Sequence, residues 1–169
     1  MVRPVRSLLG VTLVSALALL SSPFHALAEV ERRHSELEAF SQRLETVLNA
    51  DAASAFDAVA IFELQPVLVQ RYQRFRKDFP GVTWSVEPAA PLDDGRQTLL
   101  LQVNGEAESE GLRYQLEAKE RIAIRLNDGR ILDQELVSHE SLLRSGQRPL
   151  AITLGTPTLF SPAAVTTLI

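Results

Sequence analysis

Apolar residues recur at helical spacing through the first half of the chain. Within residues 29–49, EVERRHSELEAFSQRLETVLN, apolar side chains fall on one stripe and charged side chains fall elsewhere. The stripe consists of Leu37, Phe40, Leu44, Val47 and Leu48. A spacing of three to four residues predicts an amphipathic helix with one buried face.

The following apolar positions predict further helix. Asp51 is placed to cap a second helix through residues 52–64. Pro66 then predicts either the start of a third helix or a kink in the second, because proline fits a first turn and damages a helix interior. The inward positions expected in the second stretch are Phe56, Val59, Ala60 and either Ile61 or Phe62. Those expected in the third are Leu68, Tyr72, Phe75 and Phe79.

After Pro80-Gly81 the apolar period changes to two, which predicts β-strands. Four strands are expected, over residues 82–88, 96–108, 112–126 and 130–143. Ser109-Glu110-Gly111 is the predicted turn between the second and third strands, and Asn104-Gly105 is a competing turn that would cut the second strand short. Asn127-Asp128-Gly129 is expected to close the last hairpin.

Helices followed by consecutive antiparallel strands indicate an α+β fold. The sheet has one apolar face, and the helical half is its only available cover. A long third strand favours bending, so we expect helices packed on a curved, cone-like, four-stranded antiparallel sheet. We assign this single domain to residues 29–146 and expect residues 147–169 to form an extended C-terminal segment, in which residues 150–154 favour a short strand.

Residues 1–28 have the order of a secretory signal peptide. Two arginines precede the apolar run of residues 8–20, and Ala26 and Ala28 occupy small-residue cleavage positions. An uncleaved membrane anchor is the less favoured alternative, because the apolar run is short for a membrane span. We therefore expect cleavage after Ala28, export to the periplasm or extracellular space, and no stable membrane anchor afterwards.

Composition narrows the function classes. The 169 residues are 46% apolar, as expected for a protein with a core. The formal net charge is -4, and without residues 1–28 it becomes -6, from 15 basic and 21 acidic residues. This acidity argues against nucleic acid as a partner, because a binder needs basic surface. The absence of cysteine excludes disulfides, cysteine-ligated zinc and a thiol nucleophile.

One carboxylate interrupts an apolar face of the third strand. The even positions there are Leu112, Tyr114, Leu116, Ala118, Glu120, Ile122, Ile124 and Leu126. A carboxyl group whose pKa is raised by an apolar site is suited to proton abstraction. Glu120 is therefore the main catalytic candidate, as a general base. The favoured alternative is structural. Either a bulge turns Glu120 to solvent in exchange for Lys119 or Arg121, or Glu120 pairs with a helix arginine near the sheet edge.

The partner of Glu120 depends on the register of the last hairpin. A two-residue loop at Asp128-Gly129 places Glu120 opposite Val137, with His139 diagonally near it. A three-residue loop shifts the pairing by one residue, turns the fourth strand over and removes His139 from the site. We predict the three-residue loop, because it places two leucines beside the apolar face instead of two acids and a histidine. His139 is therefore the weaker catalytic candidate.

Other residues suggest little chemistry. His34 and His139 have no metal-ligand spacing, so we expect neither a metal nor a cofactor. No nucleophile elbow, phosphate-binding loop or dinucleotide fingerprint is present in the sequence. Trp84 and Tyr114 belong either to the core or to a ligand cavity. The expected pocket lining is Trp84, Tyr114, Leu116 and Ile122.

The hairpin IRLNDGRILDQELV, residues 124–137, carries a resemblance to a known family. With the preceding helices and long strands, it resembles the NTF2-like (cystatin-like α+β) superfamily over residues 30–143. The resemblance implies an open cone with enzymatic or non-enzymatic roles, but the first-helix Tyr or Asp of isomerase-like members is not evident. Residues 142–157, LLRSGQRPLAITLGTP, are similar to secreted cyanobacterial proteins of unknown function, which implies no activity.

Three functions follow as hypotheses. The first is a non-catalytic exported module that binds a small apolar ligand or an envelope protein partner. The second is an isomerase- or dehydratase-type enzyme with Glu120 as general base. The third is an assembly protein whose C-terminal segment adds a strand to a sheet edge.

Overall fold

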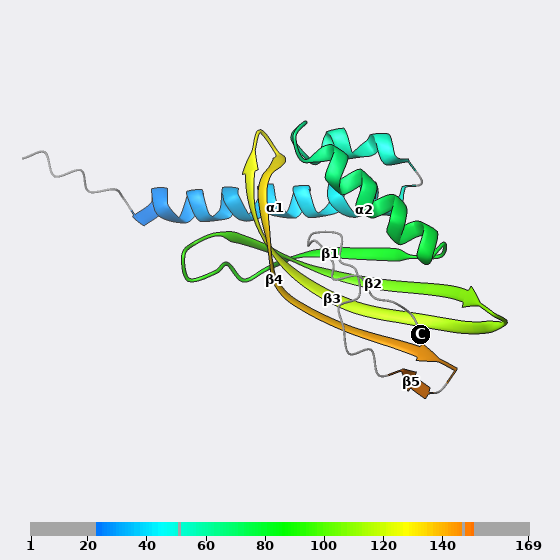
Figure 1. Ribbon diagram of the computed structural model, residues 1–169. Helices are drawn as coiled ribbons and strands as arrows, with labels where there is room; N and C mark the ends of the chain where they lie inside the picture. The colour runs from blue at the N-terminus through cyan, green and yellow to red at the C-terminus, as the bar shows by residue number, and fades with distance from the viewer. Residues whose placement is uncertain (1–22, 51, 147, 151–169) are drawn as a thin grey trace, which may run out of the picture.

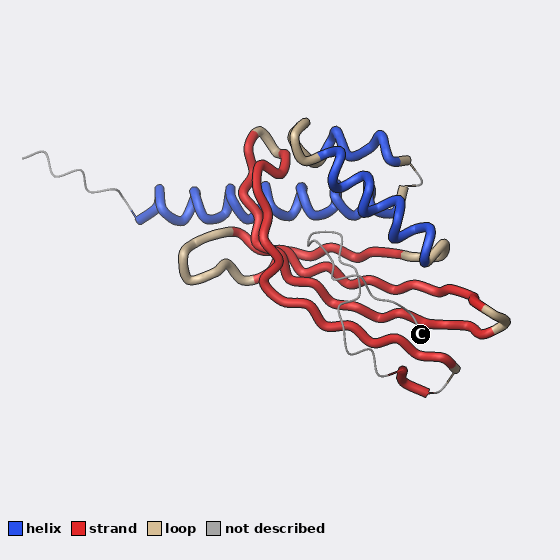
Figure 2. Tube along the Cα trace, in the orientation of Figure 1, coloured by secondary structure: helices blue, strands red, loops and turns tan. Residues whose placement is uncertain are grey.

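The computed structural model describes residues 23–50, 52–146 and 148–150, and in these the helical half precedes a single antiparallel sheet (Figure 1). The helices lie on one face of the sheet, which is curved and open (Figure 2). The helical elements are α1 (Pro23–Asn49), the 3-10 helix η1 (Ala53–Ala58) and α2 (Gln65–Asp78). The strands are β1 (Thr83–Ala89), β2 (Gln97–Ser109), β3 (Leu112–Asn127), β4 (Arg130–Ser145) and β5 (Arg148–Leu150). The predicted α+β class and helical cover are confirmed.

The apolar stripe of α1 is buried as predicted. Leu37, Phe40, Leu44, Val47 and Leu48 all belong to the core. The helix begins six residues earlier than the predicted Glu29, and its first turns extend past the sheet (Figure 1). Leu27 and Val30 on these turns are exposed. Within the described residues, none of the helices combines the length and the apolar character needed to cross a membrane.

The second predicted helix is reduced to η1. The chain leaves the helical conformation because it joins the sheet: the Ile131 N–H donates to the Val59 carbonyl and the Ile61 N–H donates to the Ile131 carbonyl. The N-cap of η1 is Ala52, without a side-chain hydrogen bond, and Asp51 lies outside the described residues. The predicted inward positions Phe56, Val59 and Ala60 are buried.

The two alternatives left open near α2 are now decided. Phe62 is 78% exposed, so the half-buried Ile61 is the inward residue of that pair. Pro66 lies in the first turn of α2, so it starts a third helix instead of kinking the second. The predicted stripe, Leu68, Tyr72, Phe75 and Phe79, is buried.

The strands form a meander in the order β1-β2-β3-β4-β5. The hairpin between β2 and β3 turns at Glu110 and Gly111, both with positive φ, as predicted. Asn104-Gly105 stays inside β2 because Phe79 packs against the backbone there: a Cβ on Gly105 would lie 3.3 Å from the Phe79 ring. The short fifth strand covers residues 148–150, and residues 151–154 of the predicted short strand lie outside the described residues.

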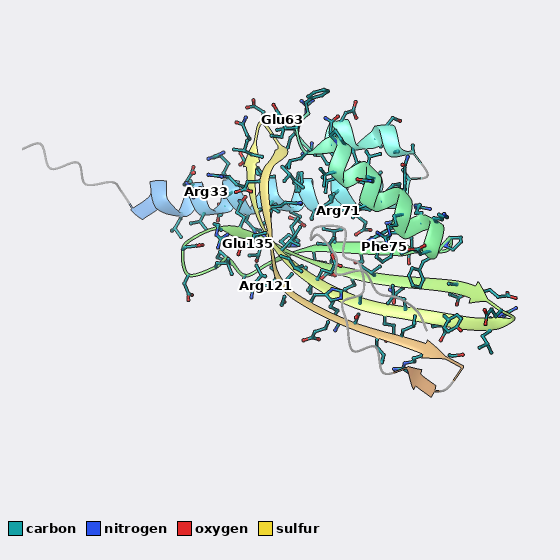
Figure 3. The ribbon with its side chains drawn as sticks, in the orientation of Figure 1. Arg33, Glu63, Arg71, Phe75, Arg121 and Glu135 are labelled. Carbon is teal, nitrogen blue, oxygen red and sulfur yellow. The ribbon has the colours of Figure 1, made fainter. Side chains whose placement is uncertain are left out.

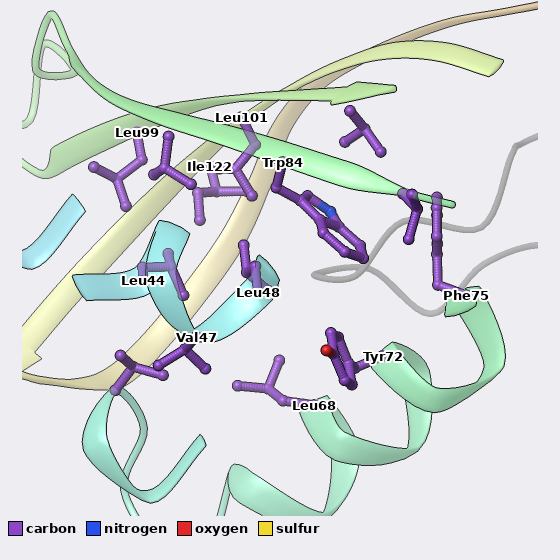
Figure 4. Packing of buried hydrophobic residues seen from close by; sticks show 14 of the residues in the cluster. Leu44, Val47, Leu48, Leu68, Tyr72, Phe75, Trp84, Leu99, Leu101 and Ile122 are labelled. Atoms are coloured by element: carbon purple, nitrogen blue, oxygen red, sulfur yellow. The ribbon is translucent and has the colours of Figure 1, made fainter. Parts of the chain in front are cut away.

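An aromatic cluster joins α2 to the sheet. The Trp84 ring lies 5.8 Å from the Tyr72 ring and 5.7 Å from the Phe75 ring, centroid to centroid. The Arg76 guanidinium lies over both Trp84 and Tyr72 and donates to the Leu48 carbonyl at the end of α1. Leucines from α1 and the sheet complete the packing in Figure 4. Three elements therefore meet at Trp84.

Side chains of α1 form hydrogen bonds with backbone groups on the outer edge of β1. The Trp84 N–H donates to Asn49 Oδ1 over 3.0 Å, and Asn49 Nδ2 donates back to the Trp84 carbonyl over 2.7 Å. The Val86 N–H donates to Glu45 Oε2 over 2.9 Å. Unpaired edge strands can pair with strands of other chains. Helix α1 therefore covers one face of the sheet and also blocks pairing at this edge.

Candidate functional site

Glu120 lies on the inner face of the sheet, the face that the helices cover. It stands in the middle of β3, the third of five strands, opposite Leu101 of β2 and His139 of β4. Its side chain is 2% exposed. Both structural alternatives proposed from the sequence are therefore wrong: Glu120 does not face solvent, and its neighbour is a histidine of the sheet instead of a helix arginine.

The register of the β3–β4 hairpin explains this placement. Asn127 pairs with Arg130, so the loop has two residues and the predicted three-residue loop is wrong. Asp128 and Gly129 have φ of 49° and 70°, which matches the mirror-image turn that favours Asp-Gly in tight hairpins. The alternation-based choice failed because it assumed one constant register along the whole hairpin.

Two bulges in β4 then change which side chains face inward. The first leaves Leu132 unpaired and the second leaves Val137 unpaired. After the first bulge, Asp133 and Glu135 point outward, where they form ion pairs with Arg125 and Arg96. Figure 3 labels Glu135 on this part of β4. The first bulge therefore removes two carboxylates from the apolar face, which burial energy favours.

The second bulge decides which residue of β4 stands opposite Glu120. Without it, Ser138 would stand opposite Glu120, since Leu136 already pairs with Ile122. The unpaired Val137 instead brings His139 opposite Glu120. Burial energy does not favour exchanging a serine for an imidazole beside a carboxyl group. The same bulge also exchanges Glu140 for Ser141 opposite Ala118 and Leu142 for Leu143 opposite Leu116, so packing along the rest of β4 accounts for the shift.

The Glu120–His139 pair has unused hydrogen-bonding capacity. His139 Nδ1 lies 3.4 Å from Glu120 Oε1, and the His139 side chain is 15% exposed. The contact is too poorly directed to count as a hydrogen bond. Among the described residues, Glu120 Oε2 and both ring nitrogens of His139 have no hydrogen-bond partner. Buried polar atoms are normally satisfied, so these three atoms require an explanation.

Burial dominates the electrostatics of the pair. Desolvation raises the pKa of the Glu120 carboxyl group, and the contact with His139 lowers that pKa in part. The net pKa shift is upward. The neutral carboxyl group is therefore favoured to a higher pH than in an ordinary glutamate, and it has one donor as well as acceptor oxygens.

The raised pKa predicts a pH-dependent stability. Between the ordinary glutamate pKa and the raised value, the folded state binds more protons than the unfolded state, so stability falls as pH rises. The free energy of unfolding of the wild type should fall relative to Glu120→Gln in this window, by at most about 1.4 kcal/mol per pH unit. Urea denaturation at several pH values measures this difference.

Glu117→Gln is the matched control, because Glu117 is an exposed glutamate of the same strand. Its stability difference from the wild type should stay flat over the same window. A wild type that gains stability relative to Glu120→Gln as pH rises would show that pairing outweighs burial in the pKa of Glu120.

The expected pocket residues are dispersed. Trp84, Leu116 and Ile122 are buried in the hydrophobic core. Tyr114 is half-buried and borders an open hollow of about 670 Å³, at the end of the sheet beside Pro80. A second hollow, of about 360 Å³, lies against Lys119 and other outward residues of β2, β3 and β4. Neither hollow is lined by Glu120 or His139, and the catalytic role of the pair stays a prediction.

Sequence reasoning missed the direct pairing of Glu120 with His139. Counting residues along β4 could not locate this pair. Each unpaired bulge residue changes which face of the sheet the following side chains point to. Within the described part of the chain, no group of three or more histidines and acidic residues could hold a metal ion. No family model, curated protein or solved structure matches this chain. The function must therefore be argued from the geometry of the pair.

Proposed function

We propose that this protein is an exported, non-catalytic module that binds a small, largely apolar ligand at the Glu120–His139 pair. The observation that supports this function is the set of three buried polar atoms without a hydrogen-bond partner, all belonging to one pair on the inner face of the sheet. A ligand with one polar group would pair with Glu120 Oε2 and with one of the two ring nitrogens of His139.

The surroundings of the pair define the ligand class. Leu101 stands directly opposite Glu120, and Ala118 and Ile122 precede and follow it on the same face, all buried. Apolar neighbours favour an apolar ligand body. Because burial favours the neutral carboxyl group, the polar end of the ligand should be uncharged and should both donate and accept, as a hydroxyl or amide group does. We place the approach of the ligand on the side of His139, the more exposed partner, where it must open a path to the buried ring nitrogens.

The pair also supports a second function, proton transfer by Glu120. A carboxyl group with a raised pKa beside an imidazole is suited to general acid–base chemistry. This is the isomerase- or dehydratase-type alternative. It differs from the binding module in one observable: an enzyme would convert a carbonyl compound that reaches the pair, whereas a binding module would release it unchanged.

Export and a relationship to the NTF2-like superfamily belong to the same proposal. The signal-peptide order of residues 1–28 supports export. Helices over one face of a curved antiparallel sheet support the relationship, because the cone that the resemblance implies would contain both features. The third function proposed from the sequence, strand addition in assembly, would use the C-terminal segment and not this pair.

Extraction of the purified protein with organic solvent, followed by mass spectrometry, tests the proposed function. The protein should be exported from a bacterial host and incubated with a total lipid extract before purification. We expect a co-purifying apolar compound with one polar group, bound by the wild type and by Glu117→Met but lost from Glu120→Met. A wild type that carries nothing contradicts the binding module, and a compound recovered in an altered form favours the enzyme.

A further inference from the structure

The outer face of the sheet, opposite to the helices, carries a second group of polar side chains (Figure 1). They surround the open hollow of about 360 Å³ that crosses β2, β3 and β4. This volume lies at the lower end of the range of about 300–1,000 Å³ that is usual for small-ligand sites. The outward side chains around the hollow come from two adjacent rungs of the ladder: Gln102, Lys119 and Glu140 in one, and Asn104, Glu117 and Leu142 in the other.

The second bulge of β4 places two of these side chains on the outer face. Without the unpaired Val137, Glu140 and Leu142 would point to the inner face. With it, Glu140 stands opposite Lys119, and Leu142 stands opposite Glu117. The bulge that brings the buried pair together on the inner face therefore also completes the outer hollow.

Three charged side chains in the hollow are not paired with one another. Lys119 and Glu140 stand on one rung, yet no ion pair within the described ranges joins them. Farther along the same face opposite charges do pair, since Arg125 donates to Asp133 over 2.9 Å. The exposed side chain of Glu117 likewise makes no hydrogen bond or ion pair with the residues that the structure describes. All three charges are therefore available to a ligand.

The outward residues of β3 and β4 form a small rectangle, with sides of about 5 Å across the strands and about 7 Å along them. Glu117 and Glu140 occupy one diagonal of this rectangle. Lys119 and Leu142 occupy the other. The rectangle thus offers two carboxylates to an ammonium group, one cation to a carboxylate, and one apolar surface. An α-amino acid carries the three complementary groups on a single carbon atom.

We propose that the outer hollow binds the zwitterion of an α-amino acid with an apolar side chain. The ammonium group of the ligand donates to Glu117 and Glu140. Its carboxylate accepts from Lys119 and from the amide of Gln102, which stands next to Lys119 on the same rung. Its apolar side chain packs on Leu142. Because the charged residues are exposed, each ion pair contributes little, and the expected Kd is about 1 mM.

Titration of the purified protein with L-leucine, followed by nuclear magnetic resonance, tests the site, because this method detects weak binding. We expect the backbone amide shifts to cluster in residues 102–104, 117–119 and 140–142. N-acetyl-L-leucine has no ammonium group and L-leucine amide has no carboxylate, so each should bind at least about threefold more weakly. Glycine has no apolar side chain and should also bind more weakly than L-leucine.

Two matched variants locate the contact with the ligand carboxylate. Lys119→Glu reverses the charge that faces this carboxylate and should weaken L-leucine binding by about tenfold. Arg113→Glu makes the same charge change at an exposed outward position toward the end of the same strand, outside the hollow. It should leave the Kd unchanged. Both side chains are exposed, and circular dichroism should confirm that both variants retain the fold.

The outcomes separate this inference from the proposed function. Clustered shifts that weaken in Lys119→Glu and not in Arg113→Glu support the outer site. Shifts scattered over the surface, or equal loss in both variants, would overturn it. Equal binding of L-leucine and its two blocked forms would overturn the zwitterion as ligand, and equal binding of glycine would overturn the apolar contact. The buried pair lies on the other face and is tested by solvent extraction, so either site can fail without the other.

Discussion

Replacing Trp84 by alanine is expected to lower the free energy of unfolding by about 3–5 kcal/mol. The indole is 4% exposed and lies between the rings of Tyr72 and Phe75 and the guanidinium of Arg76. Its removal leaves a cavity where α1, α2 and β1 meet, and close-packed neighbours on three elements cannot all collapse into it. Urea denaturation followed by far-ultraviolet circular dichroism measures the loss. Tryptophan fluorescence cannot be used, because Trp84 is the only tryptophan.

Two variants control this experiment. Thr83→Ala changes the exposed neighbour on the same strand and should alter stability by no more than about 0.5 kcal/mol. Trp84→Phe keeps an aromatic ring and should lose less than the alanine variant. A loss below about 1 kcal/mol for Trp84→Ala would show that the helices are not anchored to the sheet at this point.

The helical cover could be predicted from the sequence because its signals are local. The spacing of Leu37, Phe40 and Leu44 fixes which face of α1 is buried, whatever the rest of the chain does. Pro66 is a local signal of the same kind, because it allows only two arrangements: a new helix begins there, or the preceding helix is kinked there. The second helix was predicted too long, because its end depends on hydrogen bonds to Ile131, which is distant in sequence and gives no local signal.

The site could be predicted only in part, for the same reason. The alternation of β3 placed Glu120 on the apolar face, and the structure confirms that position. The position of His139 depends on two bulges, and each bulge reflects competition between pairing and burial across strands. Asp133 and Glu135 provide a usable signal for the first bulge, because a constant two-residue register would bury both. Glu140 provides the same kind of signal for the second bulge, because a register that continued unchanged past Leu136 would place it opposite Ala118 on the inner face.

Replacing Glu120 by methionine is expected to raise the free energy of unfolding by about 1–3 kcal/mol at neutral pH. The carboxyl group is buried among apolar residues, and Oε2 has no hydrogen-bond partner among the described residues. An unbranched thioether of similar length removes that desolvation cost and retains apolar contacts. His139 loses a neighbour but no hydrogen bond, because neither of its ring nitrogens has a hydrogen-bond partner in the described part of the wild type. The gain should increase at higher pH, where the wild type must ionise Glu120 or retain its proton at increasing cost.

The direction of this change distinguishes a functional carboxyl group from a structural one. Glu117→Met, on the exposed face of β3, should change stability by no more than about 0.5 kcal/mol and controls for the substitution itself. If Glu120→Met is more stable than the wild type and no longer carries the ligand, the carboxyl group is kept at a cost in stability, as expected for a binding or catalytic group. A loss of more than about 1 kcal/mol would instead make the Glu120–His139 contact a structural pair, because breaking a stabilising buried pair is costly. The three unpartnered atoms would then no longer support a ligand site.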